Sequence, residues 1–223
     1  LSLAPRETKA AVCVAFGELM FGYDRINPER SIYCTQRVIA LAEELQSPKQ
    51  LQWAWRFLGQ FYYQREQYDS AAVCYANAEK WIEEMASGKP TPDRPEGYDK
   101  AEIDNVLSSF YANRANLYYD TGDIERTMED YARAEKIFEK YGWTESRAVL
   151  WYNKGEIYKE QEELKKAGEA YEKSLRLGQE AGDSLWMAMP KRGLAEVFMK
   201  EGRTTRALRY LQEADAYFSV HQD

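Results

Sequence analysis

Histidine is almost absent from this sequence, which removes the residue on which many catalytic and metal sites depend. The single histidine, His221, lies near the end of the chain, so zinc sites and histidine-based triads lack their ligands and bases. No Gly-x-Gly-x-x-Gly or P-loop pattern occurs either. Paired glutamates such as Glu162 and Glu163 are interpreted as solvated helix faces, because a carboxylate acid–base pair needs a pocket. We therefore predict that the protein is not an enzyme and holds no metal or cofactor.

Long apolar runs are missing, and cysteines are few. No stretch of about 18 apolar residues could cross a membrane, and no signal-peptide pattern is present. Cys13, Cys34 and Cys74 are odd in number, far apart and embedded in helical apolar patterns. They are interpreted as buried reduced thiols of a cytoplasmic protein, with a redox or metal role as the alternative. Since the sequence begins with Leu1, we expect it to be a piece of a longer protein.

Clusters of basic residues are also lacking. The formal net charge is −7, and no basic run is longer than Lys191-Arg192, which follows Pro190. Binding to a phosphate backbone needs clustered Lys and Arg side chains, so no nucleic acid is expected to bind this segment.

Proline and glycine are sparse except in one short segment. Residues 87–98 contain Pro90, Pro92, Pro95, Gly88 and Gly97, which excludes a helix there. The segment is interpreted as a surface insertion between helix pairs. The alternative is a loop that folds over a binding groove or contacts a partner, because long loops often have functional roles.

Aromatic residues, by contrast, are abundant, with 17 tyrosines, and they recur with small residues in a fixed pattern. Residues 55–62 read Trp-x2-Leu-Gly-x2-Tyr, and residues 71–78 read Ala-x3-Tyr-x2-Ala. This pattern resembles the tetratricopeptide-repeat (TPR) family, in which small residues lie where two antiparallel helices cross closely. The resemblance implies binding to another polypeptide, without saying which one.

The pattern recurs with an interval of 40 residues, longer than the roughly 34 of the common repeat. The chain is therefore similar to the longer-repeat members of the family. Five columns keep this register over three copies: Ala115, Gly155 and Ala195; Tyr118, Tyr158 and Phe198; Thr127, Ala167 and Ala207; Tyr131, Tyr171 and Leu211; Ala134, Ser174 and Ala214.

Helical periodicity predicts an all-α fold, a right-handed α-solenoid of about five antiparallel helix pairs. The expected helix spans are 5–23, 28–46, 48–65, 68–86, 98–121, 123–140, 144–161, 164–181, 184–201 and 203–219. The expected organisation is a degenerate first pair over 1–47, a pair over 48–86, the insertion 87–98, pairs over 99–142, 143–182 and 183–219, and a tail 220–223 that continues in the parent protein. Asn27, Ser47, Thr144 and Asp183 are predicted to cap helices.

The first helix of each pair is expected to line the concave side of the solenoid with the face that does not pack. The tyrosines there offer flat apolar area, and the amides can bond an extended backbone, which suits a peptide or a partner helix. The predicted groove residues are Trp53, Arg56, Gln60, Tyr63, Gln64, Asn113, Asn116, Tyr119, Asp120, Tyr152, Asn153, Glu156, Lys159, Arg192, Glu196 and Lys200.

The function expected from the resemblance is a non-enzymatic protein- or peptide-binding scaffold. One TPR subclass grips a C-terminal carboxylate with paired cations, but Val149 and Asn153 stand where its third repeat needs them, so that specificity is not carried over. The alternative is a ligand- or peptide-sensing region of a transcription regulator or sensor kinase. A third reading is weak end-to-end self-association through the apolar Tyr217 and Phe218.

Overall fold

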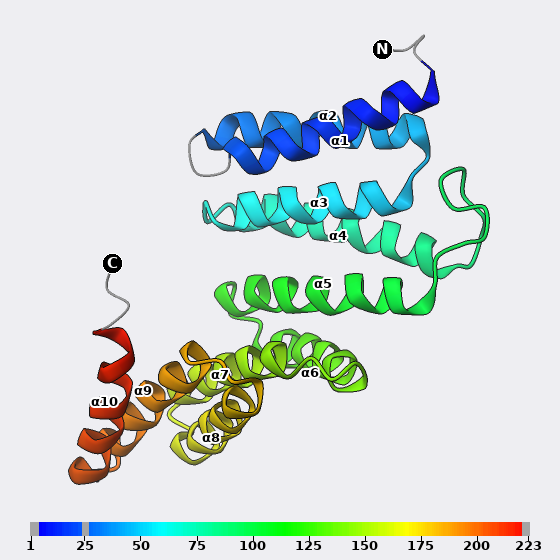
Figure 1. Ribbon diagram of the computed structural model, residues 1–223. Coiled ribbons are helices and arrows are strands. Elements are labelled where there is room, and N and C mark those ends of the chain that lie inside the picture. Colours follow the sequence, from blue (N-terminus) through cyan, green and yellow to red (C-terminus); the bar gives the residue numbers. More distant parts are fainter. Residues whose placement is uncertain (1–4, 24–26, 220–223) are drawn as a thin grey trace. The chain divides into compact units, whose positions relative to one another are not determined.

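A computed structural model describes residues 5–23 and 27–219, and these ranges form ten α-helices and no strand (Figure 1). The helices follow one another in antiparallel pairs. Their bounds are α1 Arg6–Tyr23, α2 Pro28–Leu45, α3 Pro48–Tyr63, α4 Tyr68–Ala86, α5 Lys100–Asp120, α6 Ile124–Lys140, α7 Thr144–Glu160, α8 Leu164–Ala181, α9 Leu185–Lys200 and α10 Thr204–Phe218. The predicted helices are therefore confirmed, with small shifts at their ends. His221 and the rest of the tail lie outside the described residues.

Two of the four predicted caps form. The Asn27 side chain accepts a hydrogen bond from the Arg30 amide at 3.2 Å, and Pro28 follows at the first helical position. The Asp183 side chain accepts from the amides of Leu185 and Trp186 at the start of α9. Both residues hold amides that the helix itself leaves unbonded.

The other two predicted caps are wrong. Ser47 precedes α3 but makes no capping bond, because its hydroxyl is hydrogen-bonded to Asp93 of the insertion instead. Thr144 is already the first residue of α7, and its hydroxyl contacts the Gly142 carbonyl oxygen at 3.3 Å. In both cases the hydroxyl forms a contact other than the expected capping bond.

The small-residue columns lie where helices touch. Ala115, Ala167 and Ala195 are fully buried, as the repeat register predicts. One close approach is at Tyr171, whose ring contacts two glycines. A Cβ built on either Gly155 or Gly193 would meet that ring at 2.6 Å, closer than real Cβ contacts allow.

The chain divides into two compact units, residues 1–130 and 131–223, with the boundary inside α6. In the first unit, one apolar cluster joins α1, α2 and α3, and another joins α4 and α5 through Tyr75 and Phe110. In the second unit, a cluster around Tyr171 and Leu194 joins α7, α8, α9 and α10. Within each unit, stacking of neighbouring pairs buries their apolar faces, as repeat proteins require.

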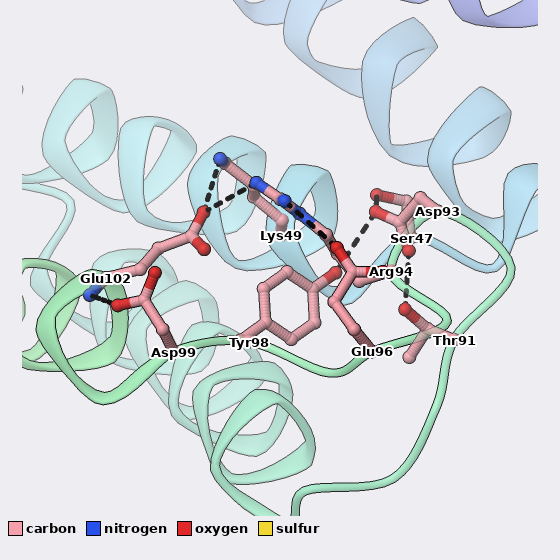
Figure 2. A network of polar contacts seen from close by, with 9 residues as sticks. All are labelled: Ser47, Lys49, Thr91, Asp93, Arg94, Glu96, Tyr98, Asp99 and Glu102. Atoms are coloured by element: carbon pink, nitrogen blue, oxygen red, sulfur yellow. Dashed lines mark hydrogen bonds and ion pairs between the residues drawn. The ribbon is translucent and has the colours of Figure 1, made fainter.

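The insertion folds back onto the helices of its own unit (Figure 2). Asp93 accepts hydrogen bonds from the hydroxyls of Ser47 at 2.5 Å, Thr91 at 2.7 Å and Tyr98 at 3.0 Å. Burial acts to raise the pKa of Asp93, but these three hydrogen bonds outweigh it and lower the pKa. The segment is thus a fixed surface element. Whether it also contacts a partner stays a prediction.

The basic side chains of Lys49 and Arg94 converge on Glu102 near the start of α5 (Figure 2). Asp99 caps the same helix by accepting from the Glu102 amide at 2.8 Å. These contacts tie the beginning of α3, the insertion and the beginning of α5 into one polar network.

The three cysteines are buried and unpaired, as predicted. Burial raises the pKa of Cys13 and of Cys74 to about 11, so both thiols are neutral at physiological pH. Among the residues that the structure describes, no helix is long and apolar enough to cross a bilayer.

Candidate partner-binding faces

The predicted groove residues lie on the first helices of successive pairs. In the first unit these are α3 and α5, and in the second unit α7 and α9, and each of these two pairs of helices is in contact. Because the two units are described separately, the residues form two candidate faces. We call them the α3–α5 face and the α7–α9 face.

On the α3–α5 face, two predicted residues bond to each other across the helices. The Tyr63 hydroxyl donates to Asp120 Oδ2 at 2.5 Å. The pKa of Tyr63 is raised above its usual range, mainly by burial and secondly by the hydrogen bond to Asp120. The phenol therefore stays protonated and acts as a donor.

Arg56 is the one cation of the α3–α5 face among the predicted residues. Its Nη1 donates to the Ser109 hydroxyl and to the Val106 carbonyl oxygen, the latter at 3.4 Å. Within residues 5–23 and 27–219 no carboxylate forms an ion pair with Arg56. Burial lowers the pKa of this guanidinium, yet arginine remains charged in proteins. A half-buried positive charge with neutral partners favours an acidic group from outside.

The remaining predicted residues of this face differ in burial. Gln60, Asn113, Asn116 and Tyr119 are half-buried, and Gln64 is exposed at the end of α3. Trp53 is also half-buried, but it is directed toward α1, where its ring lies 3.2 Å from the position of a Cβ on Gly17. Trp53 therefore belongs to the contact between the first two pairs.

The α7–α9 face is organised around Glu156. Its Oε2 accepts from Lys159 at 2.8 Å, and its Oε1 accepts from the Tyr171 hydroxyl at 2.6 Å. Lys159 also reaches across to Glu196 on α9, at 2.7 Å. On the same face, a hydrogen bond with the Tyr152 hydroxyl raises the pKa of Arg192. Five predicted residues therefore meet here: Tyr152, Glu156, Lys159, Arg192 and Glu196.

The charged side chains of this cluster stabilise each other's ionised forms. Burial acts to raise the pKa of Glu156, but the hydrogen bonds from Lys159 and Tyr171 outweigh it and lower the pKa. Burial likewise acts to lower the pKa of Lys159, and its bonds to Glu156 and Glu196 raise it instead. Both side chains are charged at neutral pH, and each neutralises the other.

Tyr152, like Trp53, lies away from its predicted place in the groove. Tyr152 is buried, with 8% of its surface exposed, and its ring packs against Tyr171 and Trp186. The burial of its ring in the second-unit core leaves only the hydroxyl toward the polar cluster. Two others are peripheral: Asn153 is half-buried, and Lys200 is exposed and pairs with Glu162 at 2.6 Å.

Two residues that complete these faces were not predicted from the sequence. The Tyr171 hydroxyl reaches Glu156 although its ring occupies a packing column, and Ser109 holds Arg56. A buried tyrosine normally finds a hydrogen-bond partner, and that rule is the signal that could have identified Tyr171.

Both faces present hydrogen-bond donors and acceptors beside aromatic rings, without a nucleophile–base pair among the residues just described. Such surfaces can hold a polypeptide by its backbone and charged side chains. Comparison with known proteins identifies the repeat family that the sequence pattern resembles. Residues 108–141 and residues 146–214 each match a family model of the tetratricopeptide repeat. The chain is a tetratricopeptide-repeat protein.

Solved TPR-like structures share the fold. BtubC (BKLC) from P. vanneervenii is 15% identical with a TM-score of 0.66, and the alignment covers 98% of this chain and 93% of that one. A Podosopora anserina protein described as a kinesin light chain with nearly identical TPR-like repeats is 16% identical with a TM-score of 0.69, covering 93% and 95%. At such low sequence identity, the structural similarity shows only the fold class, which is the all-α solenoid predicted from the sequence.

A third similar structure is the apo form of RapI, at 18% identity and a TM-score of 0.71. The alignment covers 89% of this TPR chain but only 51% of RapI. No curated protein matches the sequence significantly.

Proposed function

We propose that this TPR chain is a non-enzymatic scaffold that binds another protein or a peptide through its α3–α5 and α7–α9 faces. The proposed location is the cytoplasm, as part of a larger protein, and no nucleic acid or membrane is expected as a partner of this segment. The contact residues are the predicted groove set without Trp53, which packs toward α1, and with Tyr152 contributing its hydroxyl alone.

The observation that supports this proposal most directly is the charge state of Arg56. Its hydrogen bonds go to a hydroxyl and a carbonyl oxygen, and Asn113, Asn116 and Tyr119 of the same face are half-buried rather than packed away. A charged group that lacks a counter-ion gains most from a ligand that supplies one. The partner is therefore expected to place an Asp, a Glu or a chain-terminal carboxylate at Arg56.

Affinity capture with the purified chain, followed by mass spectrometry, would supply the partner, and calorimetry would then give its Kd. Arg56→Gln is expected to weaken binding at least about tenfold, because a charge-assisted bond is lost. Salt should weaken wild-type binding more than binding by the variant. Val73→Ser is the matched control, since Val73 lies on α4 with 61% of its surface exposed.

Arg56→Gln must keep the wild-type melting temperature for this result to report on binding. An unchanged Kd in a variant that folds normally would contradict a role for the α3–α5 face. Loss of binding in Val73→Ser would move the contact to the outer helices.

A second candidate is the sensing region of a longer regulator. It is supported by the likeness to RapI, of which this chain spans about half. The full-length gene sequence would distinguish a scaffold from a sensing region, because a sensor needs an output domain next to this segment. A parent protein without such a domain would exclude this candidate.

A further inference from the structure

A cavity lies between the second helices α2 and α4, over one side of α3, which contacts both. Its volume is about 400 Å³, within the range of small-ligand sites in proteins. Ile39 of α2, Trp55 and Leu58 of α3, and Val73 and Cys74 of α4 supply its apolar walls. We call it the outer cavity. All its lining residues belong to the first unit, and none is a predicted groove residue.

The repeat register identifies a counterpart of this cavity that side chains fill. Trp151 of α7 occupies the same repeat position as Trp55, four residues before a glycine at a close helix contact. The Trp151 indole N–H donates to Glu135 of α6 at 2.7 Å. Lys154 donates to the same carboxylate at 2.8 Å, and Lys173 of α8 lies 3.7 Å from the centroid of the Trp151 ring. Three charged side chains therefore occupy the space beside this tryptophan.

The same positions are apolar around Trp55. Ile39 stands sixteen residues before Trp55, as Glu135 stands sixteen residues before Trp151. Leu58 stands three residues after Trp55, where α7 has its lysine. No carboxylate therefore accepts from the Trp55 indole. In the part of the chain that the structure describes, its N–H donates to no protein group, and it is not sealed from solvent.

A second counterpart of the outer cavity is also filled. Arg114 of α5 stands at the repeat position of Leu58, one residue before the small residue of the close contact. Its guanidinium bonds Glu79 of α4 at 2.8 Å and Asp130 of α6 at 2.7 Å. In both counterparts a cation from the first helix and carboxylates from second helices occupy the space. The shorter, uncharged Leu58 leaves it open.

The lining of the outer cavity determines which kind of ligand fits. The described residues that line it include no charged side chain, and its polar members are Gln36, Tyr62, Ser70 and the indole N–H of Trp55. Transfer of an ion into such a site is unfavourable, because nothing there compensates the charge. The apolar walls suit a ring, and the unpaired indole N–H suits an acceptor oxygen.

We propose that the outer cavity binds a neutral small molecule that carries one ring and a carbonyl oxygen. The ring packs against Leu58 and Val73, and the oxygen accepts from the Trp55 indole N–H. The ligand oxygen thus has the role at Trp55 that the Glu135 carboxylate has at Trp151. This small-molecule site goes beyond the proposed function and is separate from the α3–α5 and α7–α9 faces.

The first test compares three probes of equal size: acetophenone, which is neutral, benzoate, an anion, and benzamidinium, a cation. Binding at neutral pH is followed by the NMR signal of the Trp55 indole N–H, assigned with Trp55→Phe. Acetophenone is expected to shift this signal saturably, and each ion to bind at least about tenfold more weakly. Equal affinity for the three probes would overturn the proposal. Absence of a saturable shift with acetophenone would show a packing groove only and would overturn it as well.

A second test isolates the hydrogen bond. In α-methylstyrene a methylene group replaces the carbonyl oxygen of acetophenone, so the two compounds differ in the acceptor. The affinity of acetophenone relative to α-methylstyrene, measured by ligand-observed NMR, should fall at least about threefold in Trp55→Phe, which keeps a ring but loses the donor. An unchanged ratio would contradict the assigned role of Trp55.

A third test locates the bound probe without changing Trp55. Ser70 and Ala72 are both exposed on α4, and of the two only Ser70 lines the outer cavity. Ser70→Phe should fill the cavity from its edge and weaken acetophenone binding at least about tenfold, whereas Ala72→Phe should bind as the wild type does. Matching melting temperatures would show that both variants fold. Equal affinities of the two variants would place the probe elsewhere and overturn the proposal.

Discussion

Arg114 on α5 and Asp130 on α6 form a two-point ion pair, with Nε donating to Oδ2 at 2.7 Å and Nη2 to Oδ1 at 3.0 Å. Both side chains are nearly inaccessible, and the rings of Phe110 and Tyr118 lie beside the guanidinium. Burial acts to lower the pKa of Arg114, but its bonds to Asp130 and Glu79 raise it. The contact holds the part of α6 that belongs to the first unit against α5.

Asp130→Ala should therefore destabilise the protein strongly, because it leaves a buried guanidinium with Glu79 as its remaining partner. We expect a loss of about 3 kcal/mol or more in the free energy of unfolding, measured by urea denaturation. Lys89→Ala removes an exposed pair with Glu84 and should change it by less than about 0.5 kcal/mol. Equal effects of the two variants would refute the structural role of the Arg114–Asp130 pair.

Two glycines of α8 should respond oppositely to alanine. A Cβ on Gly178 would lie 2.2 Å from the Trp186 carbonyl oxygen, which is backbone and cannot rotate away. Gly178→Ala is thus expected to cost about 1–3 kcal/mol or more through overpacking. Gly168 has only Val197 within contact range, at 3.9 Å, so Gly168→Ala should stabilise by up to about 1 kcal/mol. Thermal unfolding of both variants measures the difference, and the same sign for both would contradict it.

Stability on the acid side should depend on Glu156. Its pKa in the folded protein is lowered, so its contribution is complete above the ordinary carboxyl range of about 4.3 and is lost as the pH falls through the folded value. Glu156→Gln is expected to flatten the fall in urea midpoint on the acid side of that range.

The control for this measurement is Glu172→Gln, on the exposed side of α8, which should leave the slope unchanged. A Glu156→Gln profile parallel to that of the wild type would show that the Lys159 and Tyr171 bonds contribute nothing to the acid transition.

The insertion should loosen when Asp93 is removed. Asp93→Ala takes away the acceptor shared by Ser47, Thr91 and Tyr98, so the segment opens more often without unfolding of the helices. Cleavage by a glutamate-specific protease after Glu96 should accelerate several-fold, while Lys100→Ala should cleave at the wild-type rate. Trypsin is unsuitable because proline follows both Lys89 and Arg94. Unaltered cleavage of Asp93→Ala would mean that other contacts hold the loop.

The helices could be predicted because their signals are local. Periodicity placed all ten helices, and the repeat register identified Ala115, Ala167 and Ala195 as buried. These features depend on neighbouring residues one to four positions apart, or on copies of one motif.

The errors arose from contacts between distant residues. Ser47 was expected to cap α3, but its hydroxyl partner lies 46 positions away in the insertion. Tyr152 was assigned to a groove from helical phase, although its ring packs on α8 and α9. The indole N–H of Trp151 donates to Glu135, and Lys173 lies over its ring, which are further contacts between residues distant in the sequence. Helical phase identifies a face only to within about a third of the circumference, so residues at its edge are ambiguous.

The contact of the Tyr171 ring with Gly155 and Gly193 has an evolutionary consequence. While tyrosine occupies position 171, replacing either glycine with a larger residue causes a clash with the ring. Related sequences should therefore show these three positions varying together, with a smaller residue at 171 wherever either glycine has been replaced.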